Sequence, residues 1–579
     1  MVAALLVSAP VFTGAAAPVP STVQGAPWPG TSLAGRLAAP RPDAGGHVLH
    51  RPEALRRFYA DRHHVPAWDS VRPDTAPAMP APPMPAPADS GETFPDGAPE
   101  AVLPPAAALL KVLSAAANEG LDQQDYHLAA IAARLVSAGP GPEERLDLDL
   151  LLTDALMNYV GDLRSGRVAP RSIDGDLAID PPRLDLAAIA RDALRAHDLA
   201  AFLAGFTPPH PDYDGLRQGL AELRNAAEEG GWPAAGPGPV LKPGMADASV
   251  PALRIRLTAT GEFDGTDLVS EVYDAELEAA VRAFQDAMEL GTDGIVGART
   301  RAALNVTVEE RIGQVAANME RLRWLPDDLG ARHVVVNIPD YRLQAVEAGQ
   351  VRLDMPVIVG SALRRTPVFT SRIDHMVYNP TWTVPTTIAR KDILPKLVED
   401  PGWLISQGIR VFDGWSADAQ PVDPFTVDWR AVGERITRYK LRQEPGPLNA
   451  LGRVKFMFPN DFDVYLHDTP QRGKFSRAVR MLSSGCVRVG DPDALAGFLF
   501  EGMPDWTPER RRQAIDAGTT RTVRLNRPVP VHLLYQTAWR DAEGRMVFRT
   551  DIYDRDRQLL AALGGKWAAH VWVAAANRD

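Results

Sequence analysis

Apolar residues recur every three to four positions through most of the first 230 residues, the spacing expected of helices that bury one face. The stretch 51–70 begins this pattern, with Leu55, Phe58 and Tyr59 on one side. The same spacing continues downstream, interrupted by Pro- and Ala-rich loops. We therefore predict an all-α scaffold domain over residues 47–229.

A Pro- and Gly-rich linker at 230–245 separates this region from a compact unit at 246–306. Leu277, Val281 and Phe284 follow helical spacing there, and glycines mark a turn into another short helix. A further helix, within residues 307–332, is predicted to connect this unit to the rest of the chain.

From His333 the apolar positions alternate, which is typical of strands with one buried face. We expect a mostly β domain over 333–560, ending in a hairpin that turns at 541–544, and a tail at 561–579. Residues 386–441 interrupt the strands with a helix-rich insertion, which we predict to form a cap over the open side of the sheet.

The N-terminal residues 1–46 combine an apolar run, an Ala-x-Ala at 15–17 and a stretch rich in Ala, Pro and Gly. The first part resembles a secretory signal that lacks its basic start, and the remainder reads as disordered. The alternatives are a disordered tail throughout, or a start codon placed too late. We expect export, and no transmembrane segment in the mature chain, because no later segment approaches the roughly 20 apolar residues that a membrane-spanning helix needs.

The formal net charge of −11 shows no excess of the basic residues that bind phosphate backbones, which argues against nucleic acid as a partner. The 579 residues include a single cysteine, Cys486. Oxidising compartments favour paired cysteines, and a lone one can form neither an internal disulfide nor a multi-cysteine metal site. Cys486 is therefore either a buried residue without a chemical role or a nucleophile.

A cysteine nucleophile needs a base, usually a histidine, to take its proton. His467 lies 19 residues before Cys486 at the end of a predicted strand, so the sheet can hold its ring. His532 competes, but it lies in mid-strand with no adjacent turn and is expected to be packed. His375 is a weaker competitor.

The residues around Cys486 suit attack on an amide carbonyl. Ser483, Ser484 and Gly485 are small, so backbone N–H groups can approach an oxyanion closely. Arg488 projects to the same side as Cys486 if the chain is extended. It would either clamp a substrate carboxylate or pair with a structural aspartate.

Aromatic side chains flank the strands that lead to this segment. Trp382, Tyr465 and Phe458 either line a groove for the substrate or pack in the core of the sheet. The stretch 449–452, Asn-Ala-Leu-Gly, is expected to contribute polar contacts.

Two stretches resemble known families. The unit at 246–306 carries Phe284-Gln285, Asp293-Gly294 and Val296-Gly297-x-x-Thr300, and resembles a peptidoglycan-binding-like three-helix module. Whether this copy binds a ligand or serves as a scaffold stays open.

The sequence "YLHDTP…SSGCVRV" resembles the catalytic signature of L,D-transpeptidases with a YkuD-type domain, and in particular their large multidomain periplasmic branch. Many members have histidine where this chain has Ser484. Further stretches similar to that branch include "GLDQQDYH", "NPTWTVP" and "PVPVHLLYQTAW", so the resemblance covers about residues 48–560.

The resemblance implies a mechanism and a location. Cys486 would attack the carbonyl before the terminal D-residue of a peptidoglycan tetrapeptide stem, with His467 as the base and the main chain of Asp468 orienting its ring. A diamino-acid amine of a second stem would resolve the thioester to give a 3→3 cross-link. Neither metal nor ATP is needed, because the thioester keeps the energy of the broken bond. The implied location is the periplasm, with other cell-wall synthesis proteins as further candidate partners.

Three alternatives remain. Water could resolve the thioester, which would make the protein an L,D-carboxypeptidase or endopeptidase. The acceptor could instead be a lysine of a protein that becomes attached to the wall. The chain could also be a wall-binding scaffold without activity, although the set of Cys486, His467 and Arg488 counts against that.

Overall fold

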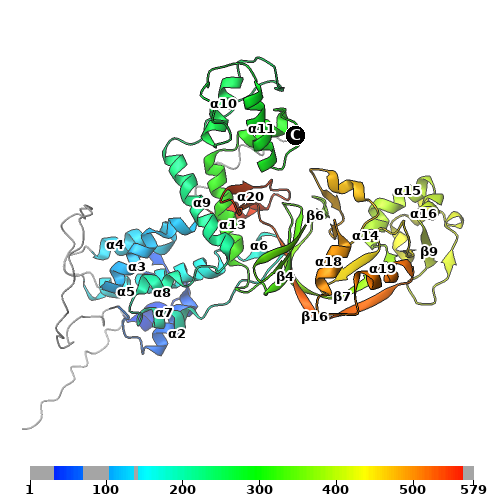
Figure 1. Cartoon of the computed structure of the whole chain (residues 1–579). Helices are drawn as coiled ribbons and strands as arrows, with labels where there is room; N and C mark the ends of the chain where they lie inside the picture. Colours follow the sequence, from blue (N-terminus) through cyan, green and yellow to red (C-terminus); the bar gives the residue numbers. More distant parts are fainter. Residues whose placement is uncertain (1–31, 69–103, 136–140, 565–579) are drawn as a thin grey trace, which may run out of the picture.

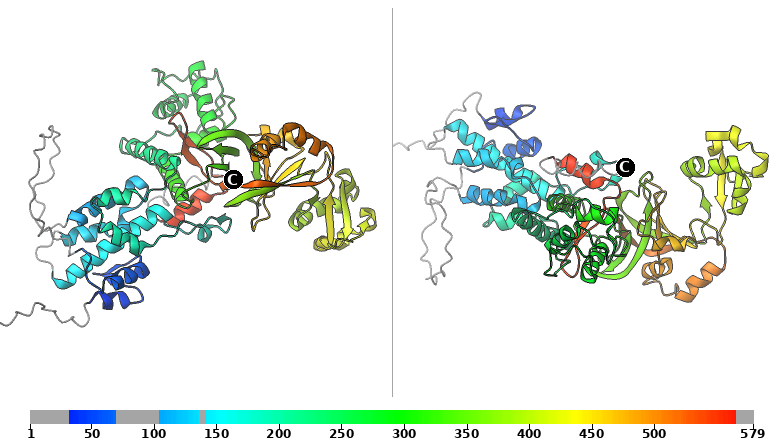
Figure 2. Two further views of the ribbon diagram at one scale, coloured as in Figure 1. Left: turned by 60° about the horizontal axis from the view of Figure 1, so that its bottom comes forward. Right: turned by 90° about the horizontal axis from the view of Figure 1, so that it is seen from above.

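The computed structural model describes residues 32–68, 104–135 and 141–564. A helical region, a small three-helix module and a β-rich domain follow one another along the chain, which confirms the predicted architecture. Figures 1 and 2 agree that the helical region and the cap lie at opposite ends, with the large sheet between them. None of the described helices combines the length and apolar character that crossing a membrane requires.

The helical region is built around α5 (Pro142–Ser165), a helix buried over most of its length. Pro142 occupies its first turn and Gly166 follows its last residue, as expected for helix boundaries. The surrounding helices are α2 (Pro52–Asp61), α3 (Pro104–Ser114), α4 (Leu128–Leu135), α6 (Pro170–Ile173), α7 (Leu186–Ala193), α8 (Leu199–Ala204) and α9 (Pro211–Glu228).

The expectation of disorder up to residue 46 is wrong for residues 32–46. They form α1 (Leu33–Ala38), β1 (Asp43–Ala44) and the start of a hairpin with β2 (His47–Val48). Leu33 and Leu37 are buried, and this burial offsets a composition that otherwise favours disorder. The signal-like segment lies outside the described residues.

The three-helix module consists of α10 (Val250–Ala259), α11 (Ala275–Ala287) and α12 (Ala298–Leu304), and it has its own apolar core. Its motif residues bond to one another: the Gln285 side-chain amide donates to Asp293 at 3.0 Å and to Thr300 at 3.1 Å. The Gly294 N–H donates to the Gln285 side-chain oxygen at 2.8 Å, and Gly294 has a φ of 72°. The motif therefore stabilises the turn between α11 and α12.

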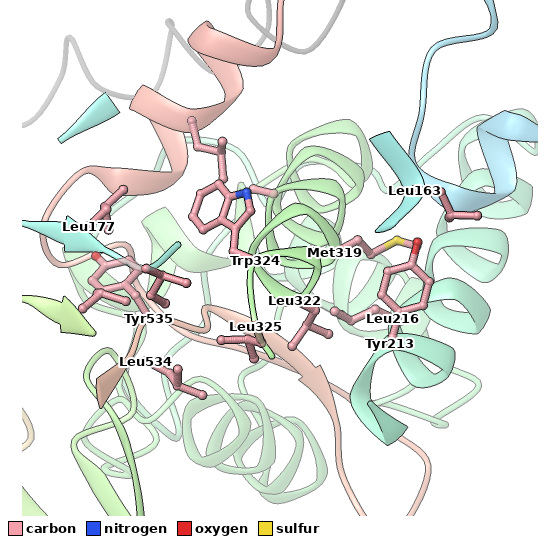
Figure 3. Packing of buried hydrophobic residues seen from close by; sticks show 14 of the residues in the cluster. Leu163, Leu177, Tyr213, Leu216, Met319, Leu322, Trp324, Leu325, Leu534 and Tyr535 are labelled. Atoms are coloured by element: carbon pink, nitrogen blue, oxygen red, sulfur yellow. The ribbon is translucent and has the colours of Figure 1, made fainter. Parts of the chain in front are cut away.

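Helix α13 (Val308–Arg323) is more than a connection between domains. It is buried on nearly all sides, and one continuous apolar core runs past it from the helical region into the β-rich domain. In Figure 3, Met319, Leu322 and Trp324 of this segment lie between Tyr213 of α9 and Tyr535 of the sheet domain. The two regions are therefore packed as one body around α13.

The large sheet has the strand order β12-β13-β15-β6-β5-β4-β16-β7-β3. The first strand in this order, β12, also pairs with β7 near the other end, so the strand pairing forms a closed ring. The helical region contributes β3 (Leu177–Ala178), which pairs with the start of β7. The remaining strands are β4 (Arg332–Asn337), β5 (Arg342–Glu347), β6 (Gln350–Gly360), β7 (Val368–Tyr378), β12 (Val454–Met457), β13 (Leu466–His467), β14 (Met481–Ser483), β15 (Val487–Val489) and β16 (Arg521–Leu534).

The cap follows β7 in the sequence and precedes β12. It contains a separate sheet of order β10-β9-β11-β8 and an apolar core of its own. Its main elements are β8 (Trp382–Thr383), η3 (Ala389–Ile393), α15 (Leu394–Glu399), α16 (Gly402–Ser406), β9 (Ile409–Asp413), β10 (Pro421–Val422), α17 (Trp429–Val432) and β11 (Tyr439–Gln443). The insertion is thus a small mixed α and β unit.

The segment after β15 covers one side of the sheet with helices. Asp491 caps α18 (Pro492–Leu499), and α19 (Pro508–Asp516) follows. The predicted hairpin is formed by β17 (Ala538–Arg540) and β18 (Met546–Phe548). Helix α20 (Arg555–Leu563) packs against α13, so the first residues of the predicted tail are helical, and residues 565–579 lie outside the described part.

Candidate active site

Strands β13 and β15 bring the predicted site residues onto one face of the sheet. They pair in parallel, with Leu466 opposite Val487 and His467 opposite Arg488. Leu466 and Val487 are fully buried in the core. Because side chains alternate along strands, Tyr465, His467, Cys486 and Arg488 project from the opposite face.

The ring of His467 is buried and oriented by the backbone. Its Nδ1–H donates to the main-chain oxygen of Asp468 at 2.5 Å, the contact implied by the family resemblance. Nε2 therefore carries the lone pair that can accept a proton. Burial, with the nearby cations of Arg488 and Lys455, lowers the pKa of His467 to about 3, so the ring is neutral.

Cys486 is a partly exposed free thiol. Burial raises its pKa above the ordinary value, although the Tyr465 N–H and the cations of Arg488 and Lys455 act in the opposite direction. The resting pair is therefore a neutral thiol and a neutral imidazole. Ionising the thiol is a step that the substrate or a proton transfer must drive.

Hydrogen bonds brace the loop before Cys486. The hydroxyl of Ser483 donates to the Cys486 carbonyl at 2.5 Å and accepts from the Gly485 N–H at 3.2 Å. Thr366 donates to the Gly485 carbonyl at 2.8 Å. Gly485 has a φ of 117°, a conformation that favours glycine. For the N–H of Cys486, the described residues offer no hydrogen-bond partner.

The carboxylate of Asp468 fixes the segment that carries the His467 acceptor. It accepts from the Arg453 N–H at 2.8 Å and from Arg472 at 2.5 Å. Gly452 lies against this carboxylate, and a side chain there would overlap it. The stretch 449–452 therefore contributes packing at Gly452 and polar contacts from the Asn449 side chain, whose amide donates to backbone carbonyls at 2.9 Å and 3.0 Å.

Arg488 forms no ion pair with any described residue. Its closest polar contact is a weak bond of 3.3 Å to the Gln471 side chain, and its Nε is buried without a partner. Its side chain helps to line a cavity of about 210 Å³ between the sheet and the cap. Trp382 and Lys396 of the cap contribute to the same wall. The structural-aspartate alternative for Arg488 therefore has no support among the described residues.

Lys455 lies in the candidate site, and the sequence did not point to it. It lies opposite His467 in the register of β12 and β13, and its ammonium is 5.0 Å from the centre of the Tyr465 ring. Like Arg488, it forms no ion pair with a described residue. The alternation around "RVKFMF" would have placed it on a strand face, but only the pairing with β13 puts it beside His467.

Arg364 is a second residue that the sequence did not reveal. It forms an ion pair with Asp392 of η3 in the cap and donates to the Ser484 hydroxyl at 2.8 Å. It therefore links the cap to the loop that carries Cys486. No motif in the sequence connects these three residues, which lie far apart along the chain.

The competing histidines are placed elsewhere. Both ring nitrogens of His532 are bonded, to Thr370 at 3.0 Å and to the Leu329 carbonyl at 2.9 Å, so this ring is packed as expected. His375 contacts Asp374 at 2.6 Å and pairs with Met457, two register positions away from Lys455. Phe458 is buried in the core against Phe369, whereas Tyr465 packs 5.8 Å from the ring of His467.

Comparisons with known proteins agree with this division of the chain. Residues 331–508 match the YkuD family model, described as an L,D-transpeptidase catalytic domain. Residues 246–304 match one described as a "Putative peptidoglycan binding domain", and residues 98–220 match one described as a scaffold domain.

A curated relative from Haemophilus influenzae, named "Putative L,D-transpeptidase", is 39% identical over 246 residues. The match covers 42% of this chain and 48% of the relative, so the chain spans about half the length of that protein. Among solved structures, an L,D-transpeptidase from Xylanimonas cellulosilytica is 17% identical, with 52% of this chain and 100% of that chain covered and a TM-score of 0.17. LD transpeptidase LdtMt1 in complex with imipenem is 14% identical, with coverages of 35% and 59% and a TM-score of 0.16.

Proposed function

We propose that this chain, which carries a YkuD L,D-transpeptidase catalytic domain and a peptidoglycan-binding domain, cross-links peptidoglycan stems through a thioester on Cys486. The observation that carries this proposal is the shared face of β13 and β15. There a neutral His467, with Nε2 left to accept a proton, projects from the same face as the thiol of Cys486, which follows a glycine-containing loop.

The first half of the reaction forms the thioester. His467 Nε2 takes the thiol proton as Cys486 Sγ attacks the carbonyl carbon that precedes the terminal D-residue of the stem. The carbonyl oxygen becomes an oxyanion, for which the N–H of Cys486 is the available backbone donor. The C–N bond then breaks, and the imidazolium returns its proton to the leaving amine of D-Ala.

The second half transfers the acyl group. The side-chain amine of a diamino acid on another stem attacks the thioester carbonyl and gives up a proton to His467. The C–S bond breaks, and the sulfur regains a proton to restore the thiol. The products are a 3→3 cross-linked dimer and free D-Ala.

Two cations that have no ion-pair partner among the described residues support a negatively charged acyl donor. Arg488 lies in the cavity wall and Lys455 lies on the other side of His467. A guanidinium binds a carboxylate through two parallel hydrogen bonds, and an ammonium adds a compact positive charge. We assign Arg488 and Lys455 to the carboxylates of the stem, and Trp382 to the apolar wall of the same groove.

The reaction is tested with purified protein and disaccharide tetrapeptides, read by mass spectrometry. A dimer that has lost one D-Ala supports cross-linking. Tripeptide alone points to the carboxypeptidase alternative, and no turnover rejects both activities. A cell-wall substrate also implies action outside the cytoplasmic membrane. Cell fractionation, followed by detection of the protein in each compartment, would test this.

Variants separate the proposed residues from their neighbours. Cys486→Ala and His467→Gln are expected to abolish turnover, whereas His375→Gln, on a neighbouring strand, should retain it. We also expect a carbapenem to acylate Cys486 and to raise the protein mass by that of the drug. Turnover by Cys486→Ala, or a mass that does not shift, would contradict the mechanism.

A further inference from the structure

A cluster in the helical region has no part in the chemistry proposed above. It consists of His50, ahead of α2, His127, after η2 (Gln123–Tyr126), and Asp154, in the middle of α5. One ligand atom from each lies within 4.8 Å of the other two. Among the described residues this is the group that could hold a metal ion.

The two imidazoles converge on a single carboxylate oxygen. His127 Nε2 lies 2.8 Å from Asp154 Oδ2, and His50 Nδ1 lies 3.1 Å from the same atom. The rings are stacked, with centroids 4.8 Å apart. Two nitrogens and one oxygen that face a common point are the donor set that Zn²⁺ takes in open three-ligand sites.

The carboxylate is held in place by backbone N–H groups. Its Oδ1 accepts from the Arg51 N–H at 2.9 Å, and the His50 N–H is shared between Oδ1 at 3.0 Å and Oδ2 at 2.9 Å. Outer hydrogen bonds of this kind orient metal-binding carboxylates and lower the entropy lost on binding. The cluster is therefore arranged before any ion arrives.

His127 is held in a conformation that non-glycine residues rarely adopt. It has a φ of 54° and a ψ of 18°, and it is buried. This geometry turns its ring towards Asp154 between two helical segments. Such a conformation costs roughly 1–3 kcal/mol, and it persists only where the surrounding contacts require it.

The cluster is open to solvent on one side. The His50 side chain is 41% exposed, whereas that of Asp154 is fully buried. His47, on the exposed strand β2, has its ring 6.1 Å from that of His127. An ion would therefore have an entry path, and a water molecule can complete a tetrahedral shell.

We propose that His50, His127 and Asp154 form a divalent-cation site with a preference for Zn²⁺, separate from the catalytic domain. The bound ion would connect three distant parts of the chain: the N-terminal hairpin segment, the loop before α4 and the central helix α5. Its role would be to stabilise the helical region. The proposal does not depend on the transpeptidase reaction.

The test uses the untagged full chain, stripped with a chelator, in a Cys486→Ala background so that the thiol cannot bind the ion. Titration with ZnCl₂, followed by calorimetry, is expected to give one ion per chain. Co²⁺ in its place should produce the visible absorption of a tetrahedral or five-coordinate nitrogen- and oxygen-ligated ion. Thermal unfolding should shift to higher temperature as Zn²⁺ is added.

Matched variants locate the ion. His127→Ala and His50→Ala should each weaken Zn²⁺ binding by at least about 100-fold. His64→Ala, an exposed histidine outside the cluster, should leave binding unchanged. If His127→Ala fails to fold, His50→Ala decides, because its side chain is on the surface. Absence of stoichiometric binding, or binding that survives His50→Ala, overturns the proposal.

Discussion

The positive charge of Lys455 beside Cys486 makes a quantitative prediction about thiol reactivity. Its ammonium lies 5.0 Å from the centre of the Tyr465 ring, on the face where Tyr465 and Cys486 are cross-strand neighbours. It acts to lower the pKa of Cys486, against the burial that raises it. Lys455→Met removes the charge and keeps an unbranched apolar side chain of similar length.

The size of the effect follows from Coulomb's law. If a separation of about 6 Å is assumed, two unit charges in an effective dielectric of about 20 interact by roughly 3 kcal/mol. Lys455 is only half-buried, so solvent screening reduces this to about 1.4 kcal/mol, which is a factor of about ten in the population of thiolate. Because the cation stabilises the thiolate, its removal should raise the thiol pKa.

The assay is the rate of Cys486 alkylation by iodoacetamide, followed by intact mass from about pH 6 to about pH 10. In the original chain the rate should rise about tenfold per pH unit until it passes the raised thiol pKa, because the thiolate is the reacting species. At pH 8, Lys455→Met should react about tenfold more slowly. Lys440→Met, in β11 of the cap, should match the original chain.

Two results would refute this reasoning. Alkylation that is independent of pH between about 5 and 8 would mean that a thiolate–imidazolium pair exists in the free protein, contrary to the neutral pair inferred from the burial of His467. An unchanged profile in Lys455→Met would mean that the ammonium points away from the sulfur in solution.

Two further predictions concern the support of the site and of the core. Gly452→Ala should lower the free energy of unfolding by about 2–4 kcal/mol, and turnover should fall with it. The reason is that the added side chain would overlap the Asp468 carboxylate and would have to adopt a φ of 63°. Gly414→Ala is the control, since it also has a positive φ but open space around it; equal losses of stability in urea unfolding would contradict the packing argument. Glu320→Gln should lower the free energy of unfolding by about 3–5 kcal/mol, because it breaks a fully buried ion pair in α13. Glu309→Gln, at an exposed position of the same helix, should change the free energy of unfolding by less than about 0.5 kcal/mol. If Glu320→Gln lost equally little, the ion pair between Glu320 and Arg323 would not be what holds α13 in the core.

The helical and β-rich regions were predictable because their apolar patterns are local. The period of Leu55, Phe58 and Tyr59 corresponds to α2, with those three residues buried. The alternation after His333 corresponds to β4 and β5. The disorder expected before residue 46 was wrong for α1, because composition does not register the burial of Leu33 and Leu37 against distant helices.

Only some residues of the candidate site could be predicted from the sequence. The motif around Cys486 and the strand that ends at His467 are local signals, and the backbone contact from His467 to Asp468 joins adjacent residues. Lys455 and Arg364 were missed because their roles arise from strand pairing and from a contact with the cap. No spacing rule connects residues that the chain brings together from such distances.

The sequence by itself determined the order of the regions and the choice of Cys486 and His467 as the candidate nucleophile and base, since each depends on residue types and short-range periodicity. Only the tertiary structure decided that Arg488 and Lys455 have no ion-pair partner among the described residues, and that the pKa of His467 is held low. It also showed that α13 is a core helix rather than a connection. These properties depend on burial and on charges brought close by folding, which a linear pattern does not encode.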